Sequence, residues 1–172
     1  MPRAKVLVSS CLLGAEERYH GGSAQSDSPI LQRWVAEGRV VSACPEVAGG
    51  LSVPRPPAEI IGGDGIQVLI GPAKVVTREG ADVTEAFRAG AEHAVGIVRT
   101  LGIRVAILKS RSPSCASGAI YDGSFTGHLA EGHGVTAAAL IQAGIRVFDE
   151  LHLDDADALL RSLDNESLIP HR

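Results

Sequence analysis

The sequence lacks the features that mark several large functional classes. No stretch approaches the roughly 20 consecutive apolar residues that a membrane-spanning helix needs. The 16 Lys and Arg residues against 20 Asp and Glu give a net charge of -4, so the chain has no general electrostatic attraction for DNA or RNA. Neither G-x-G-x-x-G nor G-x-x-x-x-G-K-S/T occurs, which excludes these glycine-rich loops for nucleotide phosphates.

Aromatic residues are scarce as well, with 1 Trp, 2 Tyr and 3 Phe, although 45% of the residues are hydrophobic. An interior of this composition is aliphatic and rich in alanine. A chain of 172 residues is long enough to bury such a core without the help of disulfides. Because no internal repeat is evident, we expect a single domain over residues 1–172.

Cysteine is nearly absent, since Cys11, Cys44 and Cys115 are the only three. An odd number at such wide spacing fits neither a disulfide framework nor a C-x-x-C zinc motif. The residues before Cys11 resemble a lipoprotein signal, but only residues 6–8 are continuously apolar, whereas a signal peptide needs roughly 7–15 apolar residues. We therefore expect a cytoplasmic protein, in which thiols stay reduced and available as ligands.

Short aliphatic runs alternate with amphipathic stretches along the chain. The pattern predicts strands at 5–9, 39–43, 104–108 and 145–148, and helices at 29–37, 83–101, 135–143 and 154–163. This alternation is typical of an α/β fold, here a three-layer sandwich with a mainly parallel, Rossmann-like sheet covered by helices on both faces. In such folds the loops that follow the strands lie at one edge of the sheet, where ligands bind.

Residues 44–82 interrupt this alternation with a stretch rich in proline and glycine. The stretch is predicted to be loop, with short strands at 66–70 and 74–76. A long loop in a compact domain is either a surface elaboration or a functional segment that closes over a site. The sequence leaves both interpretations open.

Each cysteine follows one of the predicted strands, so the three thiols should meet at the same edge of the sheet. Three thiolates can hold a metal ion or an iron-sulfur cluster while leaving one coordination position free. Zinc bound by three thiolates usually takes a histidine as its fourth ligand. Of the 6 histidines, His20 lies nearest to a cysteine along the chain.

Polar residues beside the cysteines are candidates for proton transfer and substrate binding. Glu46 lies two residues after the second cysteine, where a carboxylate would suit proton transfer. Ser112 and Ser114 precede the third cysteine and could donate hydrogen bonds to sulfur or substrate, or could be turn residues around a proline. Arg55 stands between two prolines on a stiff backbone, which suits contact with an anion or a carbonyl group.

At these stretches the chain resembles the thiouracil desulfidase family, a group of small bacterial iron-sulfur proteins. The resemblance covers about residues 4–150. The matching segments are VSSCLLG at 8–14, RY at 18–19, CPEVAGGL at 44–51, PR at 54–55, DVT at 82–84, AILK at 106–109, SPSC at 112–115, IYDGSF at 120–125 and GHGVT at 132–136.

The resemblance implies a 4Fe-4S cluster held by Cys11, Cys44 and Cys115, with the fourth iron open. It implies non-redox desulfurisation of a thiolated pyrimidine such as thiouracil, free or within a nucleoside. In the chemistry that the resemblance implies, water attacks the carbon bonded to sulfur, and the sulfur passes to the open iron. Glu46 and Ser112 are the residues expected to handle protons.

The resemblance also bears on which residues contact the substrate. His20 stands where the family usually has aspartate, so we expect His20, with Arg55 and Ser114, to contact the substrate. The expected partner is a small thiopyrimidine, without DNA or a membrane; tRNA is kept as an alternative, and the protein is expected to be a monomer or a homodimer. A non-catalytic iron-sulfur or zinc-binding module, acting as a redox sensor or structural unit, remains the rival interpretation.

Overall fold

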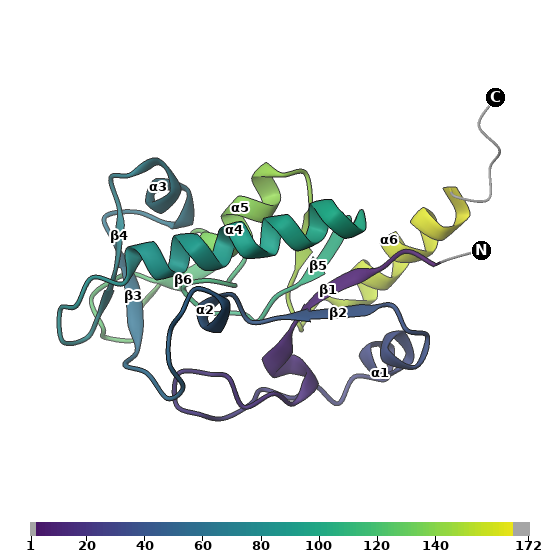
Figure 1. The fold of residues 1–172 in the computed structure, drawn as a ribbon, viewed down its shortest axis with the longest axis horizontal. Helices are drawn as coiled ribbons and strands as arrows, with labels where there is room; N and C mark the ends of the chain where they lie inside the picture. The colour runs from purple at the N-terminus through teal and green to yellow at the C-terminus, as the bar shows by residue number, and fades with distance from the viewer. Residues whose placement is uncertain (1–2, 167–172) are drawn as a thin grey trace.

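A four-stranded parallel sheet lies at the centre of the molecule (Figure 1). The computed structural model describes residues 3–166 of the chain. The strands follow the order β2-β1-β5-β8 and comprise β1 (Val6–Ser9), β2 (Val40–Ala43), β5 (Val105–Ile107) and β8 (Arg146–Phe148). β1 and β5 are buried along their whole length, as expected of central parallel strands that are covered on both faces.

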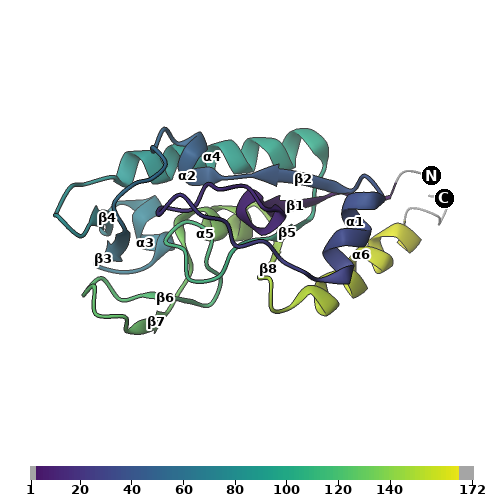
Figure 2. The same ribbon diagram turned by 90° about the horizontal axis from the view of Figure 1, so that it is seen from below.

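Helices cover both faces of this sheet (Figure 2). One face carries α1 (Pro29–Ala36) and α6 (Leu153–Glu166), and the other carries α4 (Thr84–Leu101) and α5 (Val135–Gln142). Side chains alternate along a strand, so Val6 and Val8 of β1 enter the first core while Leu7 enters the second. The predicted three-layer α/β fold is confirmed.

Successive strands are added to the sheet first on one side of β1 and then on the other. The crossover through α1 leads from β1 outward to β2, and the crossover through α4 then leads back past β1 to β5. A crevice forms where such a reversal occurs, at the carboxyl ends of the two strands on either side of it. Cys11 follows β1 and Cys115 follows β5, so the topology directs both of these segments to that crevice.

Two small antiparallel pairs lie outside the main sheet (Figure 1). They are β3 (Ala58–Ile61) with β4 (Lys74–Thr77), and β6 (Ala119–Tyr121) with β7 (Leu129–Glu131). β4 confirms the strand that was predicted at 74–76. The antiparallel pairs make the sheet content mixed, although the central sheet is wholly parallel.

The strand predicted at 66–70 is wrong, because this segment forms the helix α3 (Gly65–Ile70). The side chain of Asp64 accepts a hydrogen bond from the backbone N of Ile66, and the side chain of Gln67 accepts one from the backbone N of Asp64, which completes a capping box. Gly71 ends the helix with φ at 117°, a conformation that glycine adopts without strain. Capping at both ends therefore decides the structure of a short apolar run that periodicity leaves ambiguous.

Two short helices follow the first two strands directly. They are the 3-10 helix η1 (Ser10–Leu13) and α2 (Pro45–Ala48). The second packs closely on α4, because a Cβ atom placed on Gly90 would lie 2.0 Å from the backbone O of Pro45, and one on Gly49 would lie 2.0 Å from the backbone O of Ala86. Glycine at both positions allows this approach, which holds the start of α2 against the longest helix.

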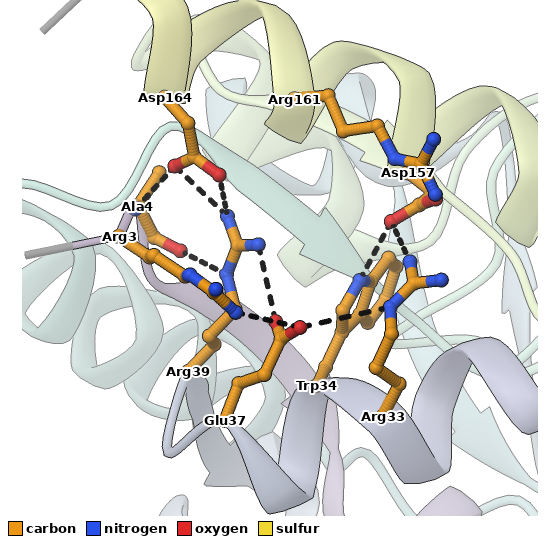
Figure 3. A network of polar contacts seen from close by, with 9 residues as sticks. All are labelled: Arg3, Ala4, Arg33, Trp34, Glu37, Arg39, Asp157, Arg161 and Asp164. Atoms are coloured by element: carbon orange, nitrogen blue, oxygen red, sulfur yellow. Dashed lines mark hydrogen bonds and ion pairs between the residues drawn. The ribbon is translucent and has the colours of Figure 1, made fainter. Parts of the chain in front are cut away.

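A polar network joins α1 to α6 (Figure 3). Trp34 Nε1 donates a hydrogen bond to Asp157 (2.9 Å), which also pairs with Arg33 and Arg161. Arg39 pairs with Asp164 (3.0 Å), and its side chain is 5% exposed. Because Arg39 precedes β2, this network lies at the amino end of the strands, opposite to the cysteines.

Candidate functional site

A cavity of about 500 Å³ lies at the carboxyl ends of the central strands, and all three cysteines line it. Cys11 belongs to η1 after β1, Cys44 immediately precedes α2 after β2, and Cys115 lies in the loop after β5. All three are free thiols. Segments that are widely separated in sequence thus bring three sulfur atoms to the wall of one cavity.

The surroundings of these thiols disfavour the thiolate form. Burial raises the pKa of Cys115 to about 12 and that of Cys44 to about 11, and burial also raises the pKa of Cys11. The nearby charge of Glu46 acts in the same direction on the first two. A bound metal centre would supply positive charge, which favours the thiolate form of the cysteines.

Ser9 supports the third cysteine from the end of β1. Its hydroxyl donates a hydrogen bond to Cys115 Sγ (3.6 Å) and accepts one from the backbone N of Lys109 (3.0 Å). The accepted bond orients the hydroxyl, so its proton points to the sulfur. Hydrogen bonds of this kind tune the thiolate ligands of a metal centre.

The donor set fits a cluster better than a single ion. Within residues 3–166, no group of three or more His, Cys, Asp or Glu side chains could hold one metal ion. Zinc binds thiolate sulfur at about 2.3 Å, so its ligands must crowd around one point. A 4Fe-4S cluster presents several iron atoms and accepts thiolates from separate directions. The three thiols come from three separate segments and line one cavity, which matches that requirement.

A carboxylate and a hydroxyl lie together at the cavity beside the thiols. Glu46, in the first turn of α2, accepts a hydrogen bond from Arg55 Nε at Oε2 (2.8 Å) and one from Ser112 Oγ at Oε1 (3.2 Å). Ser112 Oγ in turn accepts hydrogen bonds from the backbone N atoms of Ser114 (3.1 Å) and Cys115 (3.0 Å). The two accepted bonds leave the hydroxyl proton directed at Glu46. The structure therefore brings together Glu46 and Ser112, as the sequence predicted.

The direct substrate contact expected of Arg55 stays a prediction, and the structure adds several contacts with protein groups. Its guanidinium donates to Glu46, to the backbone O of Glu17 (2.9 Å) and to the backbone O of Ser52 (3.2 Å). The side chain borders the cavity but is only 6% exposed. Arg55 is thus bound to protein groups on several sides, which sequence alone did not indicate.

Ser114 and His20, which were also expected to contact the substrate, do not line the cavity. Ser114 is fully buried, and its hydroxyl bonds to Thr136 Oγ1 (2.8 Å) inside the protein. His20 is exposed outside the cavity, and its Nδ1 accepts a hydrogen bond from the backbone N of Gly22 (3.0 Å). Its neighbour Tyr19, part of the same motif, lines the cavity instead.

Another part of the cavity wall comes from the stretch after Cys44 and from the β6–β7 hairpin, whose individual residues the sequence analysis did not assign to the site. Glu59 of β3 lines the cavity, and its Oε1 accepts hydrogen bonds from the backbone N atoms of Gly123 (3.0 Å) and Phe125 (3.2 Å) in the β6–β7 hairpin. Arg78 lies over the ring of Phe125, 5.7 Å from its centre. Part of the proline-rich stretch after Cys44 therefore lines the cavity, which favours the functional one of the two interpretations that the sequence left open.

Comparisons with known proteins agree with this arrangement. A family model described as 2-thiouracil desulfurase matches residues 6–152. A Bacillus subtilis (strain 168) protein, the uncharacterized protein YbbK, is 51% identical over 150 residues, which are 87% of this chain and 98% of that protein. A solved structure of the 4Fe-4S-dependent thiouracil desulfidase TudS matches with a TM-score of 0.84 and 48% identity, over 94% of this chain and 99% of that one.

Proposed function

This chain belongs to the 2-thiouracil desulfurase family, and we propose that it removes sulfur from a thiolated pyrimidine at a 4Fe-4S cluster held by Cys11, Cys44 and Cys115. One observation carries the proposal: the three thiols line the same cavity as the Glu46 and Ser112 pair. The cavity volume of about 500 Å³ lies within the range of small-molecule sites. The similar TudS structure is of a thiouracil desulfidase that depends on the same cofactor.

The reaction exchanges sulfur for oxygen without net electron transfer. Water forms the new carbon-oxygen bond, the carbon-sulfur bond breaks, and sulfur leaves as hydrosulfide. When bound, the cluster supplies an iron position without a protein ligand, which acts as a Lewis acid toward sulfur. The remaining tasks, which are to orient the substrate, exclude bulk water and move protons, belong to side chains around the cavity.

Glu46 is the group that we propose takes the proton from the attacking water. Its two oxygens are held by Arg55 and Ser112, so the carboxylate cannot turn away from the cavity. Ser112 donates a 3.2 Å hydrogen bond to Glu46, so the pair can relay a proton. A base that is fixed in position before the substrate arrives needs little reorganisation during the reaction.

The location and the partner are proposed on chemical grounds. A cluster bound by thiolates requires reduced cysteines, which favours the cytoplasm. In the described part of the chain no helix has the length and hydropathy of a membrane span. A cavity of this size, closed on one side by the β6–β7 hairpin, favours a small thiopyrimidine as the substrate.

Anaerobic reconstitution tests the proposed function. Protein loaded with iron and sulfide should show a broad visible absorption band, and should convert 2-thiouracil or 4-thiouracil to uracil with one sulfide released per turnover. The same protein loaded with zinc is the matched control and should form no uracil. Fully loaded protein that forms no uracil from either substrate would favour the non-catalytic module instead.

A further inference from the structure

The guanidinium group of Arg55 connects the three segments that carry the cysteines. These are the first segment (residues 10–19), the second (44–46) and the third (112–115). Arg55 donates from Nε to Glu46 Oε2 (2.8 Å) in the second segment, and from a terminal nitrogen to the backbone O of Glu17 (2.9 Å) in the first. Its backbone N donates to the backbone O of Tyr19 (2.6 Å), also in the first segment. Glu46 continues the connection, because its other oxygen accepts the bond from Ser112 (3.2 Å) in the third segment.

We propose that Arg55 is a positioning residue: it holds the Glu46 carboxylate in place and braces the first cysteine segment against the second. This inference rests on the proposed function. Three of the five N–H donors of the guanidinium bind protein groups, and the side chain is only 6% exposed. Arg55 could not turn toward a substrate without releasing Glu46 and the carbonyl groups.

The geometry of these bonds requires arginine. The planar guanidinium presents donors at fixed angles, so one group can bind a carboxylate on one side and two backbone carbonyls on others. Lysine carries the same charge at a single atom on a flexible chain. An Arg55→Lys substitution therefore keeps the charge beside Glu46 and removes the fixed directions, which separates positioning from simple charge neutralisation.

Arg39 provides a matched control at the opposite edge of the sheet. Its side chain is 5% exposed, pairs with Asp164 (3.0 Å) and donates from Nε to the backbone O of Ala4 (2.9 Å). Arg39→Lys thus disturbs a buried guanidinium of similar surroundings, far from the cavity. Both variants are loaded with cluster and are assayed well below their own melting temperatures, so that lost stability does not enter the comparison.

Two measurements then test the role of Arg55. With 2-thiouracil as substrate, Arg55→Lys should lower kcat roughly 10- to 100-fold, as expected for a displaced catalytic group, while KM changes less than about 2-fold. The rate of iron loss to a chelator in the absence of substrate should rise several-fold, because the cysteine segments are no longer braced. Arg39→Lys should leave kcat, KM and the rate of iron loss unchanged.

Other results would overturn the inference. A raised KM with unchanged kcat would make Arg55 a substrate contact, and equal effects in Arg39→Lys would make its role merely structural. Should Arg55→Lys fail to fold, Arg55→Gln takes its place. It removes the charge as well as the fixed donor directions, so kcat should again fall with little change in KM, and iron loss should again become faster. Wild-type protein that is loaded but inactive would refute the proposed function, whereas iron loss would still decide whether Arg55 braces the segments.

Discussion

The three thiols combine two properties that conflict in the absence of a metal. A ligand for a metal centre must be a thiolate, yet burial raises the pKa of each cysteine at this cavity. In the cluster-free protein these groups are therefore neutral near pH 7 and resist reaction with electrophiles. Cluster binding must then release protons, which ties the affinity for the metal centre to pH.

Alkylation of cluster-free protein tests whether the Cys44 thiol is neutral and slow to react. With a pKa of about 11, roughly one Cys44 thiol in a thousand is ionised at pH 8, against about a quarter of free cysteine. The higher nucleophilicity of such a thiolate offsets part of the difference, so we expect iodoacetamide to react roughly 10- to 100-fold more slowly than with free cysteine. The rate should still be rising at pH 10. Mass spectrometry of the labelled peptide measures it, and labelling as fast as free cysteine would contradict the raised pKa.

Removal of any one cysteine should abolish cluster binding. Cys11→Ala, Cys44→Ala and Cys115→Ala each leave two thiolates, which cannot hold three corners of a cluster. Iron content per chain and the visible absorption band after anaerobic reconstitution measure the loss. Circular dichroism checks that each variant is folded. A variant that binds a full complement of iron would remove its cysteine from the proposed ligand set.

At the scale of secondary-structure elements, the contact between α2 and α4 positions the second cysteine. Gly90→Ala places a Cβ atom 2.0 Å from the backbone O of Pro45, so α2 and the adjacent Cys44 must move. We expect a lower melting temperature and reduced iron content. Gly96→Ala is the matched control on the same helix, because nothing lies within 4 Å of its added Cβ, and replacing an interior helical glycine gains roughly 0.5–1 kcal/mol. Equal behaviour of the two variants would show that this contact is not needed.

The network between α1 and α6 predicts a dependence of stability on pH. Burial of Asp157 opposes its ionisation, but hydrogen bonds from Arg33 and Trp34 hold its pKa below the ordinary value. Its contribution to stability is therefore fully present above about pH 4, the ordinary aspartate pKa, and is lost as the pH falls through the lower folded pKa.

Urea denaturation of Asp157→Asn tests this contribution. At pH 7 the variant should be less stable by about 1–3 kcal/mol, the usual range for hydrogen bonds to charged groups, and the difference should shrink below pH 4. Asp154→Asn, an exposed position on the same helix, should change stability by less than about 1 kcal/mol. A constant difference between wild type and Asp157→Asn from pH 7 to pH 2.5 would contradict the lowered pKa.

Elements were predictable where local signals and packing agree. The helix at α1 was foreseen from Ser28 and the proline after it, and Ser28 indeed caps the helix by accepting a bond from the backbone N of Ile30. The run at 66–70 has no such agreement, because apolar residues in a short segment suit a strand and a helix equally. The side-chain bonds of Asp64 and Gln67 decided its structure.

The candidate site was predictable only in part, because the order of the elements places loops but not side chains. Alternating strands and helices determine which loops share an edge of the sheet, so the positions of the three cysteines followed from the order of elements. The directions of individual side chains do not follow from that order. Ser114 bonds inward to Thr136, and Arg55, which borders the cavity, binds Glu46. Only the packed structure determines these contacts.

At the scale of the whole molecule, the cluster should stabilise the fold. Its three proposed ligands follow β1, β2 and β5, which are adjacent strands of the central sheet. A ligand that binds only the native state at 100 times its Kd adds roughly 2.7 kcal/mol. For a chain of this length that corresponds to an increase in melting temperature of roughly 5–10 °C.

Anaerobic calorimetry of loaded and cluster-free protein measures this increase. Cys115→Ala treated with the same iron and sulfide is the control, and its melting temperature should not change. Equal melting temperatures for the loaded and cluster-free wild-type protein would show that the metal centre contributes nothing to holding the three strands together.

The two walls of the cavity come from different parts of the chain. The thiols stand on loops of the central sheet, whereas Glu59, Arg78 and Phe125 belong to the small antiparallel pairs attached beside it. Substitution of these outer side chains can therefore admit a differently shaped molecule while the inorganic centre keeps its three anchors. Protein engineers have the same freedom, and varying these side chains on an otherwise unchanged base is a direct route to desulfidases with new substrate ranges.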